Sequence, residues 1–384
     1  MQLARTARPV AVTVGTAVIA LTMAACGSSS TSGTAANSDG ATSDTSQTSS
    51  AKVTPINETV HPETSSLCGD KDLTIDYLSA YDTPWQQISY AEFQKEASAC
   101  PNVKTNYLSA SADTQKSIAN IQGAAAQGVD GIVIYPVAGE PELPAMRQAY
   151  QRGLAVVPFD NLEAGTAGTD YTDYVGIDLE GAGRSQADAL GKALNGKGNV
   201  VYIGGPAGTS FTQTVFGGFK DELAAKYPGI KILTGKPVAT DYSASNTQQV
   251  MAGLFASDSK IDGLMLDYGA AGTGALHAYQ AAGKPFPNTV AMATDNEFGC
   301  LWKKAAPKTA DLFTLDGMTT LSKIAFRKAL AAAAGTKDPE SPTVTAFVSA
   351  DTANGQQPKC DTSLPPAADL NGDLSTSEIA QILK

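Results

Sequence analysis

The sequence has 384 residues, of which 42% are hydrophobic and 17% charged, and its formal net charge is −11. A chain of this length exceeds one ordinary hydrophobic core and predicts more than one folded domain. The acidic charge argues against binding to nucleic acids or to anionic lipid surfaces.

The N-terminus has the pattern of a secretory signal with a lipobox. Arg5 and Arg8 precede an uncharged run from Val10 to Leu21, and the sequence Thr22-Met23-Ala24-Ala25-Cys26 follows. The run is shorter than the ~20 apolar residues that span a bilayer, so it predicts a cleaved signal peptide over residues 1–25. We expect Cys26 to carry a lipid that anchors an extracytoplasmic protein to the outer face of the cytoplasmic membrane. Removal of the signal takes away two arginines and no acidic residue, which leaves a net charge of −13.

Residues 26–66 are expected to form a flexible tether. Serine, threonine, glycine and alanine dominate the segment after Cys26, and such a composition buries too little apolar surface to fold. The composition becomes that of a globular protein at about Leu67. The remaining roughly 315 residues suit two domains.

Cysteine usage agrees with export. If Cys26 carries lipid, Cys68, Cys100, Cys300 and Cys360 form an even set for two disulfides. Four cysteines allow three connectivities. We favour Cys68–Cys100 and Cys300–Cys360, because each closes the shorter loop and the second ties the long C-terminal tail to the body.

Short apolar runs alternate with longer helical patterns between residues 72 and 316. This order predicts an α/β fold with parallel sheets that are wound on both sides by helices. Among the helices, we expect 245–256 to begin with a capping box of Ser245 and Gln248. The pattern also predicts helices over 84–99 and 141–152. The predicted strands are LTIDYL from Leu73, VKTNYL from Val103, GIVIY from Gly131, LAVVPF from Leu154, NVVYIG from Asn199, GLMLD from Gly263 and TVAMAT from Thr289.

Polar and aromatic residues follow these strands, where a parallel sheet binds its ligand. The set contains carboxylates, amides and rings but no lysine or arginine. It suits a neutral hydroxylated molecule, whose hydroxyls donate to carboxylates and whose apolar faces stack on rings. The residues are Asp82-Thr83-Pro84-Trp85-Gln86, Pro136, Asp160-Asn161, 205–210, Asp267-Tyr268 and Asp295-Asn296.

Four segments in order, 127–161, 198–219, 263–284 and 289–296, resemble the ribose-binding group of type I periplasmic sugar-binding proteins, the substrate-binding components of ABC transporters. The resemblance implies two doubly wound lobes and three hinge crossings, near Ile177, Gly317 and Thr345. The lobes would be 67–177 plus 318–345 and 178–317 plus 346–384, the latter including the tail. It also implies a monomer that delivers a sugar or polyol to a permease.

The resemblance also implies a set of ligand-binding positions. Gln86 stands where a second ring is common, Asn161 and Val215 replace arginines, and Tyr268 replaces an asparagine, so ribose itself is not the expected ligand. Each residue has a structural alternative: Trp85 could pack its helix onto the lobe, and Asp160 could brace its loop. The ligand residues carried over are Asp82, Trp85, Gln86, Asp160, Asn161, Tyr242, Tyr268, Asp295 and Asp316.

Other functions fit less well. The chain has two histidines, His61 and His277, and no GxSxG elbow, so we expect no enzyme and no cofactor, although Asp160 and Asp295 could in principle serve acid–base chemistry on a glycoside. GAAGTG from Gly269 and GGPAGTS lack the spacing of nucleotide-binding loops. A DNA-binding regulator would need an N-terminal helix-turn-helix, and the predicted export signal occupies that place in this sequence. A ligand sensor for a membrane receptor and a binder of a non-sugar molecule stay open.

The segment DLNGDLSTSE, 369–378, resembles the start of a calcium loop. Leu374 takes the place of the glycine at the sixth position, and Glu378 arrives at the tenth place instead of the twelfth. The pattern better predicts a last helix capped by Ser375, with Glu378 completing the box. We therefore expect no metal, with calcium as the alternative.

Overall fold

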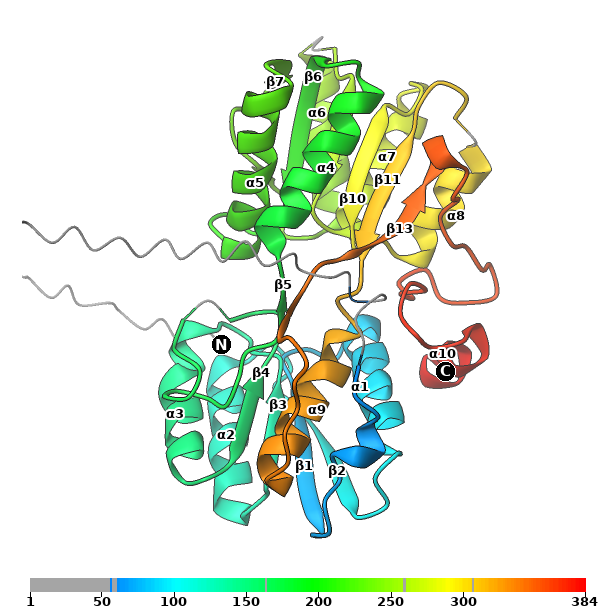
Figure 1. The fold of residues 1–384 in the computed structure, drawn as a ribbon. Helices are drawn as coiled ribbons and strands as arrows, with labels where there is room; N and C mark the ends of the chain where they lie inside the picture. The colour runs from blue at the N-terminus through cyan, green and yellow to red at the C-terminus, as the bar shows by residue number, and fades with distance from the viewer. Residues whose placement is uncertain (1–55, 57–60, 163, 258–259, 306) are drawn as a thin grey trace, which may run out of the picture. The chain divides into compact units, whose positions relative to one another are not determined.

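The computed structural model describes residues 56, 61–162, 164–257, 260–305 and 307–384 (Figure 1). The expected signal peptide, the lipidated Cys26 and the tether up to residue 55 lie outside the described residues. Within the described part of the chain, none of the helices has the length and apolar character needed to cross a membrane.

The first lobe is built on a parallel sheet with strand order β2-β1-β3-β4. Helices α1 and α9 cover one face, and α2 and α3 cover the other (Figure 1). The apolar run of β3 is buried throughout: Val133 packs with Phe326 of α9, whereas Ile132 packs with Met146 of α3. The elements are β1 (Leu73–Ser79), α1 (Pro84–Ala97), β2 (Val103–Ser109), α2 (Thr114–Gln127), β3 (Gly131–Ile134), η2 (Glu140–Glu142), α3 (Leu143–Gln151), β4 (Ala155–Pro158) and α9 (Leu321–Ala334).

The second lobe is built on a seven-stranded sheet in which β13 alone runs antiparallel to its neighbour, β11. Its main order is β13-β11-β10-β9-β6-β7, and β8 pairs with β6. Helices α4 and α5 cover one face, and α6, α7 and α8 cover the other (Figure 1). The elements are α4 (Leu179–Ala193), β6 (Lys197–Gly204), α5 (Ser210–Lys226), β7 (Gly229–Ile232), β8 (Val238–Ala239), α6 (Ala244–Ala256), β9 (Gly263–Leu266), α7 (Gly269–Ala281), β10 (Asn288–Met292), α8 (Asn296–Ala305), β11 (Leu312–Asp316) and β13 (Phe347–Asp351).

The chain crosses between the lobes three times, as expected. Two crossings run side by side, because β5 (Gly176–Ile177) pairs in parallel with β12 (Thr343–Val344). The third follows β11 at Gly317, whose φ of +128° favours glycine and where a Cβ would lie 2.6 Å from Ile56. The α/β fold with two parallel-sheet lobes and a three-crossing hinge is confirmed.

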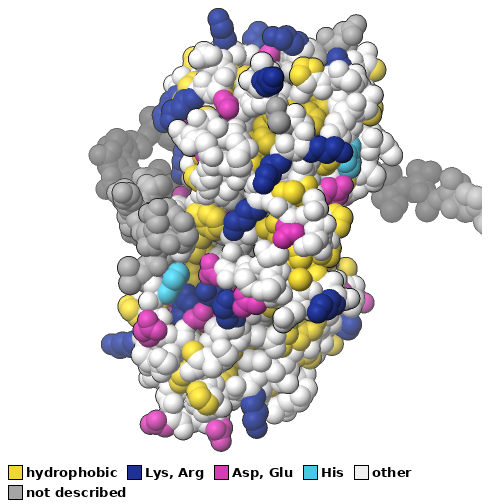
Figure 2. Space-filling view, turned by 90° about the vertical axis from the view of Figure 1, so that its right-hand side faces the viewer, with side chains coloured by type: hydrophobic (Ala, Val, Ile, Leu, Met, Phe, Trp, Pro, Cys, Tyr) yellow, Lys and Arg dark blue, Asp and Glu magenta, His cyan; other side chains and the backbone are white. Residues whose placement is uncertain are grey.

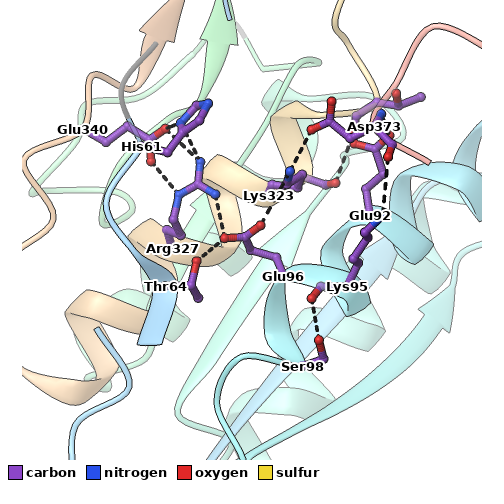
Figure 3. A network of polar contacts seen from close by, with 12 residues as sticks. His61, Thr64, Glu92, Lys95, Glu96, Ser98, Lys323, Arg327, Glu340 and Asp373 are labelled. Atoms are coloured by element: carbon purple, nitrogen blue, oxygen red, sulfur yellow. Dashed lines mark hydrogen bonds and ion pairs between the residues drawn. The ribbon is translucent and has the colours of Figure 1, made fainter. Parts of the chain in front are cut away.

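Folded structure begins before residue 67, where the tether was expected to end. Ile56 is buried against the hinge, and Thr64–Ser66 forms the short helix η1. His61 hydrogen-bonds to Glu340, which also pairs with the buried Arg327 at 2.7 Å (Figure 3). Arg327 pairs with Glu96 as well, so a buried guanidinium joins the N-terminal segment to α1 and α9. Sequence pattern alone could not show that these polar residues find buried partners.

Both expected disulfides are present. Cys68–Cys100 links the N-terminal segment to the end of α1, and Cys300–Cys360 links α8 to the C-terminal tail. The tail, residues 356–384, then reaches the first lobe, where its apolar side chains pack on Ile88 of α1. It therefore spans both lobes, in contrast to the expectation that it belongs to the second lobe alone. The tail ends in helix α10 (Thr376–Ile382).

One of the two predicted helix caps is confirmed. Ser375 and Glu378 form the capping box of α10. The predicted box of Ser245 and Gln248 is wrong, because α6 begins at Ala244 and its N-cap is Ser243, whose side chain accepts a hydrogen bond from Asn246. Ser243 has the extended backbone that an N-cap needs, so the N-cap lies two residues earlier than expected.

Candidate ligand-binding site

The three predicted ligand residues that follow β1, Asp82, Trp85 and Gln86, differ in their burial and in their contacts. Trp85 is partly buried at the start of α1, and its ring lies 5.4 Å from that of Tyr135 in an edge-to-face contact. Gln86 is buried inside the lobe, where its side-chain oxygen accepts hydrogen bonds from Ser79 and Tyr77. Asp82 is exposed and accepts a hydrogen bond from Ser111. Of the three, Trp85 is the one that meets the other aromatic residues at the end of the sheet.

Asp160 follows β4 with a left-handed backbone, φ +60°, which aspartate and asparagine tolerate better than most residues. Its backbone is fixed on both sides, because its N–H donates to Val175 and its carbonyl oxygen accepts from the Tyr174 hydroxyl. Burial raises the pKa of the carboxyl to about 7. Among the described residues, the carboxylate has no hydrogen-bond partner. The next residue, Asn161, uses its amide to bind the Pro136 carbonyl oxygen at 2.9 Å.

Tyr242 lies on the second lobe in the turn before α6. Asp241 and Tyr242 both have a φ of +54°, and this turn lays the tyrosine ring over the end of β6. A Cβ on Gly205 would lie 2.1 Å from the ring, so a glycine is needed there. The Tyr242 ring contacts that of Tyr268 at 5.4 Å.

Asp267 follows β9 and is fully buried beneath these two rings. Thr212 donates to its Oδ2 at 2.6 Å, whereas Oδ1 has no hydrogen-bond partner within the described part of the chain. Burial raises the pKa of this carboxyl to about 7. The sequence pattern also predicts Asp267 at a strand end, but the ligand residue predicted there is its neighbour Tyr268.

Asp295 and Asp316 end the next two strands. Asp295 accepts hydrogen bonds from the Phe298 N–H at 2.8 Å and from Thr273 at 3.3 Å. Asp316 is buried at the hinge and accepts from the Gly317 N–H at 2.8 Å and from Asn371 of the tail at 2.7 Å. Burial raises the pKa of each carboxyl to about 6.

The groups of the two lobes face each other closely enough to interact electrostatically. After burial, the charge of Asp160 is the next cause that raises the pKa of Tyr135 on the same lobe, and it also contributes to the raised pKa of Tyr242 on the second lobe. Tyr242 and Tyr268 in turn contribute to the raised pKa of Tyr135. The strand ends of the two sheets therefore lie near one another, and together they form the candidate site.

The chemistry of this site is that of hydrogen-bond acceptors and aromatic faces. Within the described residues, no group of three or more histidine, cysteine, aspartate or glutamate side chains is arranged to hold a metal ion. A surface cavity of about 410 Å³ lies elsewhere, at the opposite ends of β10 and β11, and is lined by Asp188, Asn288 and Asp311 among others. It does not adjoin the site residues.

Residues 77–337 match the family model described as a periplasmic binding protein domain. The chain belongs to the periplasmic binding protein family. Membership confirms the expected resemblance to the type I group, and this is a family of extracytoplasmic solute-binding proteins. The match begins within β1 and ends before β12 and β13, so it covers most of both sheets and two of the three hinge crossings.

Curated relatives and solved structures agree with this assignment. The binding protein is 28% identical over 183 residues to the xylitol-binding protein of Mycolicibacterium smegmatis, covering 48% of this chain and 51% of the relative. It is 25% identical over 274 residues to the D-xylose-binding periplasmic protein of Escherichia coli, covering 71% and 75%. A Bacillus halodurans solute-binding protein with bound myo-inositol has the same fold, with a TM-score of 0.64 at 18% identity, covering 73% and 95%. The alignment thus spans about half the length of the xylitol-binding relative.

Sequence reasoning does not select several residues that lie at this binding protein's candidate site. Tyr135 ends the predicted strand GIVIY, and an aromatic residue at a strand end is a usable signal. The sequence pattern explains Asp369 and Asn371 of the tail only as part of a calcium loop or as the approach to a helix cap. No sequence signal links them to Asp316, and only the folded chain brings them together.

The raised pKa values predict how ligand-free stability varies with pH. Asp160, Asp267, Asp295 and Asp316 stay protonated to pH 6–7 when folded but ionise near pH 4 when unfolded. The contribution of each carboxyl group to the free energy of unfolding is fully present below pH 4 and is lost as pH rises through the folded pKa of that group. The loss amounts to at most about 1.4 kcal/mol per pH unit for each group.

We therefore expect the melting temperature of the ligand-free protein to fall by several degrees between pH 5 and pH 8. Differential scanning calorimetry across this range measures it. Asp160→Asn removes one of the titrating groups and should make the fall shallower. A melting temperature that rises steadily from pH 5 to pH 8 would contradict the assigned ionisation states.

Proposed function

We propose that this protein is an extracytoplasmic solute-binding lipoprotein that captures a neutral sugar or polyol and delivers it to an ABC importer. The signal over residues 1–25 directs export, and lipidated Cys26 with the segment up to the folded body tethers a monomer to the membrane. The lobes are 67–177 plus 318–345 and 178–317 plus 346–384, with the tail shared between them. The protein performs no chemistry on its ligand.

One observation carries this proposal: carboxylates and aromatic rings from both lobes face a common site. Asp160 presents a carboxylate with no hydrogen-bond partner in the described part of the chain, and Trp85, Tyr135, Tyr242 and Tyr268 present rings nearby. Hydroxyl groups donate to carboxylates, and the apolar faces of a sugar ring stack on aromatic side chains. The proposed ligand residues are Asp82, Trp85, Gln86, Asp160, Asn161, Tyr242, Tyr268, Asp295 and Asp316.

The relatives support the same ligand class. Those named above bind xylitol and D-xylose, which are neutral and hydroxylated. An anionic ligand would lie against several carboxyl groups, and a buried charge without an opposite charge is costly. A ligand sensor that signals to a membrane receptor would use the same site, and the neighbouring genes distinguish the two roles.

A thermal-shift screen tests the ligand class. We expect a pentose, hexose, pentitol or inositol to raise the melting temperature, because a ligand at a hundred times its Kd adds ~2.7 kcal/mol to stability. Sugar acids, amino acids and aromatic acids serve as the comparison set and should give no shift. A response to amino acids or aromatic acids alone would overturn the sugar assignment and leave the fold assignment intact.

A further inference from the structure

The C-terminal tail is anchored to the second lobe at its start. The Cys300–Cys360 disulfide joins it to α8. The side-chain amide of Asn296 then donates to the backbone oxygens of Asp361, Leu364 and Pro365. These contacts fix the chain as it leaves the second lobe and turns towards the hinge.

The far end of the tail docks on the first lobe. Ile88 of α1 packs with Leu364, Leu370, Leu374 and Ile379 in one apolar cluster. Polar contacts also hold the tail on the first lobe: the Asp373 N–H donates to Glu92 at 2.9 Å, and the Asp373 carboxylate pairs with Lys323 at 2.7 Å (Figure 3).

Gly372 permits this close approach, because a Cβ there would lie 2.0 Å from Glu92. Figure 2 shows the side of the molecule that carries the tail, where acidic and basic side chains are interspersed among uncharged ones. The segment between Leu364 and Asp373 is thus held at both ends.

Asp369 lies in the middle of that held segment, among the proposed ligand residues. Its backbone forms an isolated antiparallel bridge with Asp295. After burial, the causes that raise the pKa of Tyr268 are the charges of Asp295, Asp369 and Asp316, in that order. The tail therefore brings a third carboxylate to the group formed by Asp295 and Asp316.

Among the described residues, one side-chain oxygen of Asp369 has no hydrogen-bond partner. Asp369 is 5% exposed, and its Oδ1 accepts a hydrogen bond from the Asn371 N–H at 2.8 Å. Its Oδ2 is buried without a hydrogen bond to any described residue. Asn371 binds Asp316 and the Thr294 carbonyl oxygen, so the turn has no freedom to move the carboxylate away.

The charges around Asp369 are mixed. Asp316 and Glu92 oppose its ionisation, and Lys359, whose ammonium is bound to the Leu370 carbonyl oxygen at 2.8 Å, favours it. A buried acceptor left without a partner costs about 1–3 kcal/mol. A ligand hydroxyl that donates to this oxygen would remove that cost, and this favours Asp369 as a ligand-binding residue.

We propose that Asp369, carried by the C-terminal tail, is a specificity-determining residue whose free carboxylate oxygen accepts a hydrogen bond from one hydroxyl group of the bound ligand. The inference rests on the proposed function, because it names a further residue of the same sugar or polyol site. It assigns the tail a direct part in recognition, in addition to its packing across the two lobes.

Calorimetric titration with monodeoxy ligands tests this assignment. D-Ribose, D-xylose, xylitol and myo-inositol are titrated first, and the tightest binder and its monodeoxy analogues are then titrated into the parent and Asp369→Ala. We expect the variant to bind the full ligand at least about tenfold more weakly, because it loses one hydrogen bond and leaves a ligand hydroxyl without its buried acceptor. For the one analogue that lacks the relevant hydroxyl, parent and variant should bind within about twofold of each other.

Companion variants separate recognition from folding. Asp369→Asn keeps the side-chain size and is used if Asp369→Ala does not fold. Asp361→Asn alters a partly buried carboxylate on the same tail, which binds Ser363, and should leave affinity unchanged. The assignment is overturned if Asp369→Ala and Asp369→Asn bind the full ligand within threefold of the parent, or if every analogue loses the same factor. In that case loss of binding in Asp160→Ala would still support the proposed function. If none of the four compounds binds the parent, both proposals fall.

Discussion

Asp160→Ala is expected to weaken ligand binding by at least about a hundredfold. The carboxylate lies at the end of β4, faces the second lobe and has no hydrogen-bond partner among the described residues, so it can accept from two neighbouring hydroxyls. Hydrogen bonds to a charged group contribute ~1.5–3 kcal/mol each, so losing two costs at least about 2.7 kcal/mol. Calorimetric titration of the parent and the variant measures the difference directly.

Two further variants identify the cause of that loss. Alanine at 160 must adopt a left-handed backbone, which costs roughly 1–2 kcal/mol of stability, whereas Asp160→Asn tolerates it. Asp160→Asn should bind roughly tenfold more weakly, since it keeps an uncharged acceptor. Asp72→Ala changes an exposed carboxylate just before β1, at the opposite end of the strands of the same sheet, and should bind normally. If Asp160→Ala lowers the ligand-free melting temperature yet binds within threefold of the parent, Asp160 only braces its loop.

Loss of the Cys300–Cys360 disulfide is expected to be the largest single stability effect. The two cysteines are 60 residues apart, and closing a loop of that length restricts the unfolded chain by about 4 kcal/mol. The double variant Cys300→Ser, Cys360→Ser should therefore unfold at a clearly lower denaturant concentration, which equilibrium guanidinium titration measures.

The matched variant Cys68→Ser, Cys100→Ser removes the disulfide of the first lobe, with a separation of 32 residues and a slightly smaller expected loss. Only the loss of Cys300–Cys360 should release the tail, which limited proteolysis after residue 360 detects. Unchanged stability and an equally protected tail in the first double variant would show that Asn296 and the Ile88 cluster hold the tail without the disulfide.

Much of the fold could be predicted because parallel strands buried on both faces have a strong pattern. The runs GIVI and LAVVP correspond to β3 and β4 with nearly every side chain buried. Shorter or edge strands lack that pattern. β13 is an antiparallel edge strand with two residues that are not buried at its start, and β5 and β12 each contain two residues, so pairing between distant segments defines them.

The site was predicted less completely, and the reason is physical. A residue such as Asp160 is identified by its place after a strand, which depends on local pattern. Gln86 occupies an equally suggestive position, but the local pattern does not show that its side-chain oxygen accepts hydrogen bonds from Tyr77 and Ser79. Asp369 reaches the site only because the disulfide at Cys360 and an apolar cluster that includes its neighbour Leu370 and the distant Ile88 direct the tail. Such long-range packing has no sequence pattern.

A crystal structure of the protein with the sugar or polyol that gives the largest thermal shift would show directly how the ligand is held. We expect one ligand molecule between the lobes, with a hydroxyl within hydrogen-bond distance of the Asp160 carboxylate and an aromatic ring of Trp85, Tyr242 or Tyr268 against its apolar face. A ligand bound elsewhere, or bound between the lobes but held by neither Asp160 nor these rings, would show that the proposed site is wrong.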